Sequence, residues 1–225
     1  MLNVRPAHPV MERVWDRAIA AQKRILLPET EDDRTLIAAE MITKTKLAVV
    51  TLLGNPEKVM RKAKDCGADI EGLEIIDPKN FDKIDAYSEK LFEIRKGKVR
   101  SLEDARSLLN NDLFFGAMLV KLGAADGMVA GAANTTADVL RPAFQLIKTA
   151  PGIALASAYF AMVIPNCPYG EDGFVLYADA GGVPDPNPEE LAEIAITSCL
   201  TMKNIFDIEE ARCAMLSYST KGSAS

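Results

Sequence analysis

The sequence predicts an α/β protein in which a mostly parallel sheet is covered by helices on both faces. Segments that fit strands alternate with segments that fit helices along the whole chain, which is typical of parallel strands joined by crossover helices. The segment 47–53 (LAVVTLL) is continuously apolar and rich in β-branched residues. Such a segment is typical of a strand that is buried on both faces of a parallel sheet.

Periodicity and helix caps predict the elements of the first part of the chain. Apolar residues between 10 and 22 recur at helical spacing. Asn55 and Pro56 fit the N-cap and first position of a helix that Gly67 ends. The expected elements are, in order, a helix at 10–22, a strand at 24–28, a helix that starts at 29–33, a strand at 47–53, a helix at 56–66, a strand at 73–77, helices at 82–95, 101–110 and 112–122, a strand at 127–130, and a helical segment through 148.

The pattern changes after the segment 149–152 (TAPG), which breaks the preceding helix. Two apolar segments follow, at 153–164 and 174–178, and they predict adjacent strands. We therefore divide the chain into an N-terminal α/β/α domain at 1–150 and the first part of a second α/β domain at 151–225.

A helix and a strand follow in the second domain. Asn187, Pro188 and Glu190 combine an N-cap, a proline at the first position and a glutamate three residues after the cap, and they open a long helix. Residues 212–217 predict another strand, and the Gly- and Ser-rich residues 219–225 fit a loop toward a further helix. We expect a fragment whose second domain is incomplete; a naturally short protein is the alternative.

Composition and charge exclude several classes of protein. With 48% hydrophobic and 26% charged residues, the composition is that of a soluble globular protein. The net charge of −6 disfavours nucleic acid and anionic lipid as partners. The longest weakly polar segment, 152–164, is too short to cross a membrane, and the N-terminus lacks a secretory signal. We therefore expect a cytoplasmic location, with no nucleic-acid or membrane partner.

Cysteine and histidine usage limits the chemistry. The 4 cysteines are far apart and form no CxxC pair, so we expect free, mostly buried thiols. The 1 histidine, His8, excludes an internal Ser-His-Asp triad and a multi-histidine metal site. Carboxylates, hydroxyls, arginines or a lysine must carry any chemistry, and we expect no metal.

Three loops that follow predicted strands are candidate sites, because ligands of parallel α/β sheets bind beyond the carboxyl ends of the strands. These loops are 131–136, 180–187 and 217–225. Neither GxxxxGK[ST] nor GxGxxG occurs. P-loop nucleotide hydrolysis and standard dinucleotide binding are therefore not expected.

The first of these loops carries groups that suit a phosphate or a carboxylate ligand. It offers a glycine, the hydroxyls of Thr135 and Thr136, amides at a helix start, and Arg141 about two turns later. The same residues also fit a local role, with Thr135 as N-cap, Asp138 completing its box and Arg141 paired with Asp138.

Four further residues have local explanations, and three of them also allow a second interpretation. Pro142 either kinks a helix or starts one, because it lacks an amide hydrogen. Arg95 by itself fits a solvated helix end. Asp179 and Lys221 follow predicted strands, where they suit contacts to an acid, a base or an anion; capping and loop solvation explain them equally well.

At these residues the chain resembles the phosphate acetyl/butyryltransferase family, and within it the phosphate acetyltransferases. The similar segments run in order along nearly the whole chain and read RILLPETEDDRTLIAAE, LAVVTLLGNPEKV, GMVAGAANTTADVLRPAFQLIKTAPG, YADAGGVPDPNPEELAEIAI and MLSYSTKGSAS. The resemblance implies two three-layer α/β/α domains, isocitrate/isopropylmalate dehydrogenase-like, with the active site in the cleft between them. It also implies a homodimer.

The resemblance further implies an acyltransferase of acetate metabolism that interconverts acetyl-CoA and phosphate with acetyl phosphate and coenzyme A, without metal. Coenzyme A is then a substrate, and no cofactor is permanently bound. A phosphate butyryltransferase is one alternative. Another is a catalytically incomplete fragment that acts only as a phosphate-binding or assembly module.

The family pattern implies which residues contact substrate. Two arginines recognise phosphate or coenzyme A. The threonines in the loop before the VLRP segment are further candidates for substrate contact, and the final segment would face the cleft from the second domain. In this sequence these residues are Arg141, Arg95, Thr135, Thr136, Ser219, Thr220 and Lys221. The serine and aspartate that the family uses in catalysis would lie beyond Ser225, so the catalytic residues are unknown. The loop AGGVPDPNP departs from the simpler turn that we expect.

Overall fold

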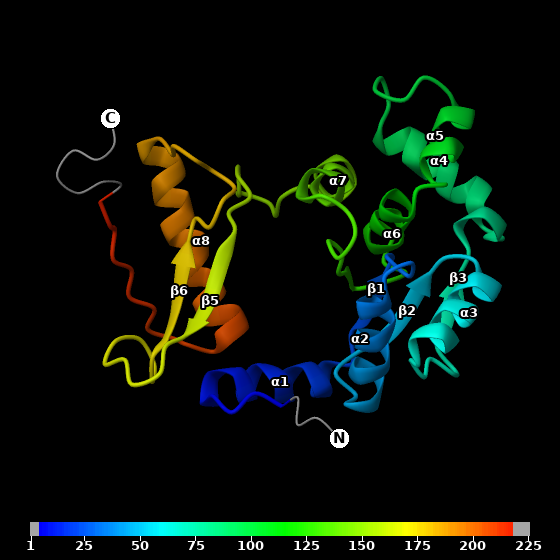
Figure 1. Cartoon of the computed structure of the whole chain (residues 1–225). Coiled ribbons are helices and arrows are strands. Elements are labelled where there is room, and N and C mark those ends of the chain that lie inside the picture. The colour runs from blue at the N-terminus through cyan, green and yellow to red at the C-terminus, as the bar shows by residue number, and fades with distance from the viewer. Residues whose placement is uncertain (1–4, 218–225) are drawn as a thin grey trace. The chain divides into compact units, whose positions relative to one another are not determined.

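The computed structural model describes residues 5–217, which form two compact units. One unit runs from Ala18 to Lys148, and the other combines the described residues before Ala18 with those after Lys148. Figure 1 shows the elements of each unit. Helix α1 (Pro9–Ala21) therefore begins in the unit of the C-terminal residues, whereas the sequence placed it in the first domain.

A parallel sheet of four strands, in the order β3-β2-β1-β4, forms the centre of the 18–148 unit. Because all four strands run in the same direction, their carboxyl ends lie along one edge. The strands are β1 (Arg24–Leu27), β2 (Val49–Leu53), β3 (Glu74–Ile76) and β4 (Gly127–Met128).

Helices connect these strands and supply both outer layers. They are α2 (Asp33–Lys44), α3 (Pro56–Cys66), a 3-10 turn (Pro78–Asn80), α4 (Ile84–Ile94), α5 (Leu102–Leu108), α6 (Asp112–Lys121), α7 (Thr136–Pro142) and a π-helical turn (Ala143–Ile147). The caps predicted for α3 are confirmed, since the Asn55 side chain accepts a hydrogen bond from the Lys58 amide and Gly67 is left-handed at φ 73°.

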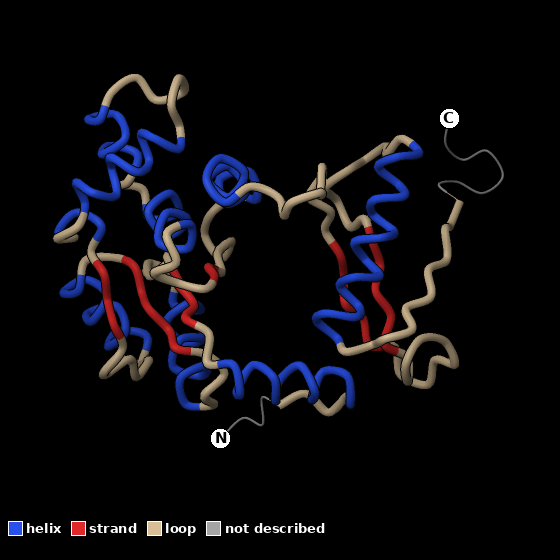
Figure 2. The backbone as a smooth tube through the Cα atoms, turned by 180° about the vertical axis from the view of Figure 1, so that it is seen from behind, coloured by secondary structure: helices blue, strands red, loops and turns tan. Residues whose placement is uncertain are grey.

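The side chains of β2 alternate between two hydrophobic cores. Leu53 packs in a core with residues of α4, α5 and α6, and its neighbour Leu52 packs in a core with residues of α2 and α3. Successive side chains of a strand point to opposite faces, so helices cover both faces of this sheet (Figure 2). The predicted three-layer arrangement is confirmed for this unit.

The structure decides between the two interpretations of Pro142. It lies at the last position of α7, buried, and the chain continues into the π-helical turn. Because proline has no amide hydrogen for the carbonyl four residues earlier, the regular α-helical pattern is interrupted at this residue. The Ala143 amide bonds the carbonyl of Leu140, and the Lys148 amide bonds that of Ala143, five residues back. A helix start at Pro142 is wrong.

The other unit contains an antiparallel pair, β5 (Tyr159–Val163) and β6 (Phe174–Ala178), and the long helix α8 (Pro188–Phe206). The predicted adjacent strands are confirmed, although residues 153–158 are not part of β5. The capping box of Asn187 and Glu190 is present at the start of α8.

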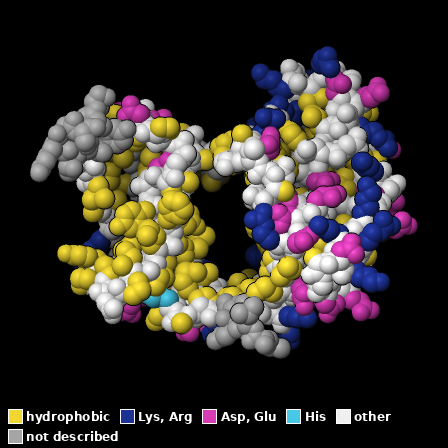
Figure 3. Space-filling model, viewed as in Figure 1, with side chains coloured by type: hydrophobic (Ala, Val, Ile, Leu, Met, Phe, Trp, Pro, Cys, Tyr) yellow, Lys and Arg dark blue, Asp and Glu magenta, His cyan; other side chains and the backbone are white. Residues whose placement is uncertain are grey.

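The hydrophobic core of this unit is small. Its buried members in one cluster are Val10, Phe174 and Phe206, so α1 contributes to it. Arg17 of α1 also donates hydrogen bonds to the carbonyls of Asn204 and Ile205 in the last turn of α8. Figure 3 shows apolar side chains gathered on the visible face over β5 and β6, where Phe160 is 62% exposed.

Two predictions about local structure are wrong. Residues 212–217 form no strand, because a strand needs a neighbour in register to bond its backbone, and the sheet described in this unit consists of β5 and β6 alone. The thiols are free but not mostly buried, since three of them are half-buried and Cys213 is exposed.

Candidate functional site

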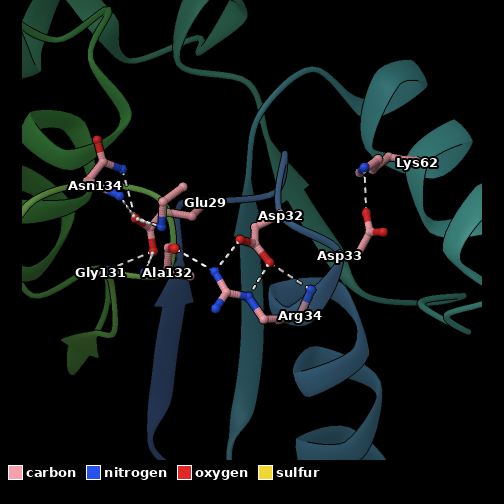
Figure 4. Close-up of polar contacts among 9 residues, drawn as sticks. Glu29, Asp32, Asp33, Arg34, Lys62, Gly131, Ala132 and Asn134 are labelled. Atoms are coloured by element: carbon pink, nitrogen blue, oxygen red, sulfur yellow. Dashed lines mark hydrogen bonds and ion pairs between the residues drawn. The ribbon is translucent and has the colours of Figure 1, made fainter.

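The loop after β4, residues 131–134, is bound to a single buried carboxylate, Glu29 (Figure 4). Glu29 follows β1 by two residues and is 6% exposed. Its Oε2 accepts hydrogen bonds from the amides of Gly131 and Ala132, both at 2.7 Å. Its Oε1 accepts from the next two amides at 3.0 and 2.8 Å, and from Nδ2 of Asn134 at 2.8 Å.

These hydrogen bonds determine the charge of Glu29. Burial alone would raise the pKa of this carboxyl, but the bonds from the Asn134 side chain and from the amides of Ala133, Ala132 and Asn134 outweigh burial and lower its pKa to about 2. Glu29 is therefore ionised at neutral pH. A carboxylate with both oxygens occupied is a structural anion and a poor general base.

Arg34 holds the same loop by its carbonyl side. Its Nη2 donates a hydrogen bond to the carbonyl oxygen of Ala132 at 2.6 Å, and its guanidinium also donates to both carboxylate oxygens of Asp32. Asp32 is the N-cap of α2. Hydrogen bonds from the side chain and amide of Arg34 lower the pKa of Asp32 to about 2, so this pair is charged at neutral pH.

The geometry changes how the loop can bind an anion. The loop was expected to offer a glycine, and the start of the following helix its amides, to an anion; the four amides at 131–134 already bond to Glu29. Gly131 has a φ of 117°, which favours glycine and turns the chain so that these amides converge on Glu29. These four amides are therefore not free to bind an oxyanion.

The local alternative for the residues after the loop is what the structure shows. Thr135 is the N-cap of α7: its hydroxyl accepts a hydrogen bond from the Asp138 amide at 3.2 Å and donates to Asp138 Oδ2 at 2.6 Å. Arg141 Nη2 lies 3.9 Å from Asp138 Oδ1, and its side chain is 59% exposed. Thr136 is exposed at the first position of α7.

Arg95 lies at the C-cap of α4 and carries a buried donor without a partner. Among residues 5–217, its Nε is one of two buried side-chain nitrogen or oxygen atoms that lack a hydrogen bond. Buried polar atoms are nearly always paired, so this donor has capacity for an acceptor. The described contacts do not bring Arg95 and Arg141 together. Ser219, Thr220 and Lys221 lie outside the described residues.

Comparison with known proteins identifies the family. The sequence model of the phosphate acetyl/butaryl transferase family matches residues 9–225. The chain belongs to this family. The resemblance seen in the sequence is thereby confirmed.

Individual relatives agree with this assignment. A phosphate acetyltransferase of Thermoanaerobacterium thermosaccharolyticum is 46% identical over 96% of this chain and 65% of the relative. One of Clostridium acetobutylicum is 43% identical over 96% and 64%. A solved phosphotransacetylase from Streptococcus pyogenes superposes with a TM-score of 0.86 at 38% identity, over 98% of this chain and 65% of that one. The chain thus spans slightly less than two thirds of these relatives.

In the other unit of this family member, Asp179 after β6 also binds a run of amides. It accepts hydrogen bonds from the amides of residues 181–183 and of Ala158, and from the hydroxyl of Ser157. Burial raises its pKa, but the bonds from Val183 and the other amides outweigh this and lower the pKa to about 2. Asp179 thus holds loop amides rather than capping a helix, and its full set of bonds argues against an acid-base role.

A cavity of about 180 Å³ opens at the carboxyl edge of the parallel sheet, among the loops after β1, β2 and β3. Its charged lining residues balance, with Lys58, Lys62 and Lys79 against Glu31, Asp77 and Asp112. Burial raises the pKa of Asp112.

Across residues 5–217, no group of three His, Cys, Asp or Glu side chains could hold a metal ion, and no helix could cross a membrane.

Sequence reasoning missed Glu29 and Arg34. Both lie in the segment RILLPETEDDRTLIAAE: Glu29 directly follows the predicted strand, and Arg34 lies in the first turn of the next helix, at the end of the sheet where side chains of α/β proteins meet ligands. That position was the available signal. Their partners lie about a hundred residues later in the sequence, and only the pairing of β1 with β4 brings these segments together.

Proposed function

We propose that the protein to which this chain belongs is a phosphate acetyltransferase, which interconverts acetyl-CoA and phosphate with acetyl phosphate and coenzyme A. The observation that carries the proposal is the family match over residues 9–225, together with relatives at 43–46% identity that bear this name. Coenzyme A takes part as a substrate, with no permanently bound cofactor.

In the proposed reaction, the thiolate of coenzyme A attacks the carbonyl carbon of acetyl phosphate. A carbon–sulfur bond forms, the carbon–oxygen bond to phosphate breaks, and inorganic phosphate leaves. A planar guanidinium pairs with two phosphate oxygens at once, which suits the exposed side chain of Arg141. The unpartnered Nε of Arg95 and the hydroxyl of Thr136 are further proposed contacts. The Thr135 hydroxyl, the remaining proposed contact, must first release its hydrogen bond to Asp138.

The first test measures phosphate-dependent release of coenzyme A from acetyl-CoA by this chain, and phosphate binding by calorimetry. Turnover by this chain would support the activity directly. Binding of phosphate without turnover would favour a phosphate-binding module for this portion of the protein. Competition between acetyl-CoA and butyryl-CoA then determines the acyl preference. This measurement is needed because one methylene changes the discrimination between substrates by only about 1–3 kcal/mol, which inspection of the sequence does not resolve.

The proposal predicts that Arg141→Gln weakens phosphate binding about tenfold or more, because a charge-assisted hydrogen bond to an anion is lost. Calorimetric titration with phosphate measures the change. Arg61→Gln is the matched control, since Arg61 is an exposed arginine on α3. Equal affinities for the Arg141→Gln chain and the unchanged chain would remove Arg141 from the site.

A homodimer and a cytoplasmic location stay predictions of the sequence.

A further inference from the structure

Four consecutive amides at 131–134 converge on one side chain, Glu29. Successive amides in such a loop form a concave nest that attracts an anion, and in phosphate-binding loops the anion is the ligand. Here a carboxylate of the protein, about a hundred residues earlier in the sequence, occupies the nest. The nest is thus filled before any substrate arrives.

The filled nest is directly continuous with the proposed phosphate contacts. Asn134 bonds Glu29 through both its amide and its side chain, and the next residue is the N-cap of α7. The N-cap of α7 is therefore directly adjacent to a segment held by five hydrogen bonds. Thr136 is the first residue of this helix, and Arg141 lies in its last turn. Arg34 holds the carbonyl of Ala132 in the same segment.

We propose that Glu29 is a positioning residue for phosphate: its carboxylate fills the amide nest at 131–134, sets the start of α7, and directs the substrate phosphate to the side chains of Thr136 and Arg141. This inference rests on the proposed function. An ionised carboxylate in the nest repels a second anion there, because like charges at contact distance disfavour each other. The substrate phosphate is thereby kept from a nonproductive position on the backbone.

Removal of the carboxylate tests this role. In Glu29→Ala, four amides of the exposed loop lose their acceptor, so we expect hydrogen exchange in a peptide covering 131–134 to rise at least tenfold, while β2 keeps its protection. We also expect phosphate affinity to fall at least fivefold. Glu29→Asp, which keeps the charge on a shorter side chain, should recover part of both. Glu89→Gln, at an exposed glutamate of α4, is the control and should match the unchanged chain.

Rescue by added acetate distinguishes an anion-filled nest from a merely structural role of Glu29. Added acetate should enter the vacated nest of Glu29→Ala and restore the protection of 131–134, with no effect on the unchanged chain. Without acetate, phosphate itself should protect these amides in Glu29→Ala but not in the unchanged chain. If Glu29→Ala does not fold, Glu29→Asp and Glu29→Gln carry the comparison of exchange and phosphate affinity. Gln keeps one acceptor oxygen and loses the charge, so it should protect 131–134 less than Glu.

Three outcomes would overturn the inference. Unchanged exchange at 131–134 in the variants would show that Glu29 does not hold the loop. Increased exchange with unchanged phosphate affinity would show that the loop does not position the phosphate contacts. A chain with native Glu29 that fails to bind phosphate would overturn the phosphate contacts proposed for this chain and the positioning role with them, whereas hydrogen exchange would still report whether Glu29 holds the loop.

Discussion

At the scale of single residues, two carboxylates perform the same task in the two units. Glu29 and Asp179 each follow a strand, and each accepts several hydrogen bonds from backbone amides of a glycine-containing loop. Backbone amides that are buried without a partner are costly. One carboxylate accepts hydrogen bonds from several of these amides at once, and those bonds offset the free-energy cost of removing the carboxylate from water.

Protonation of Glu29 should therefore loosen the loop at low pH. Its folded-state pKa of about 2 lies below the ordinary value of 4.5, so the stability it contributes is present above pH 4.5 and is lost as the pH falls toward 2. Amide chemical shifts of Gly131 and Ala132, followed by NMR from pH 6 to 2, should stay constant through pH 4.5 and begin to change only as the pH approaches 2.

Other charges near Glu29 define the controls for this titration. Arg34, which bonds Ala132, keeps its charge across the range. Asp32 also has a pKa of about 2, so an Asp32→Asn variant separates its titration from that of Glu29. The amides should not respond in Glu29→Gln. A midpoint near 4.5 in the unchanged chain would contradict the hydrogen-bonded geometry.

At the scale of elements, helix ends were the most predictable features. The caps of α3 and α8 follow from Asn-Pro pairs that satisfy the first free amides of a helix within a few residues. The end of α7 was less predictable, because the response to Pro142 depends on packing. Leu146 of the π-helical turn is fully buried in the core shared with α6, which favours continuing the helical turn over breaking it.

Loss of the cap of α8 should destabilise its unit. Asn187 accepts a hydrogen bond from the Glu190 amide at 2.9 Å, so Asn187→Ala should cost about 1 kcal/mol of the free energy of unfolding. Urea denaturation followed by circular dichroism measures this cost. The same substitution at Asn204, in the last turn of α8, should be neutral or slightly stabilising because alanine favours helix. Equal effects at both positions would mean that the capping box contributes nothing.

At the scale of the whole molecule, the two units differ in their cores. The 18–148 unit has two hydrophobic cores on the two faces of its sheet. The other unit has one small cluster around Phe174 and Phe206, whose ring centroids are 4.7 Å apart, and it exposes every residue of β5. Local stability follows buried apolar contacts, so the smaller unit should open at lower free energy.

Native-state hydrogen exchange tests this difference. Amides of β2 should be the most protected, and Phe174→Ala should remove protection from β6 and α8 while β2 is unaffected, because a buried phenylalanine contributes about 3–5 kcal/mol. Phe160→Ala, at a residue that is 62% exposed on β5, should have little effect. Simultaneous loss of protection in β2 and β6 would mean that the two units unfold together.

The sequence by itself determined the features that depend on neighbouring residues. Strand β2, the caps of α3 and α8, and the N-cap at Thr135 each follow from apolar runs or from side chains within four positions of their partners. The family also followed from the sequence, because its motifs occur in order along the chain.

Only the tertiary structure decided how the candidate site is organised. Residues 212–217 have the composition of a strand, but strand formation requires a partner that local sequence does not specify. The sequence does not show which group accepts the amides of 131–134; parallel pairing of β1 with β4 places Glu29 against them. An internal carboxylate and a ligand compete for the same hydrogen bonds, and which of them is present depends on contacts between residues a hundred positions apart.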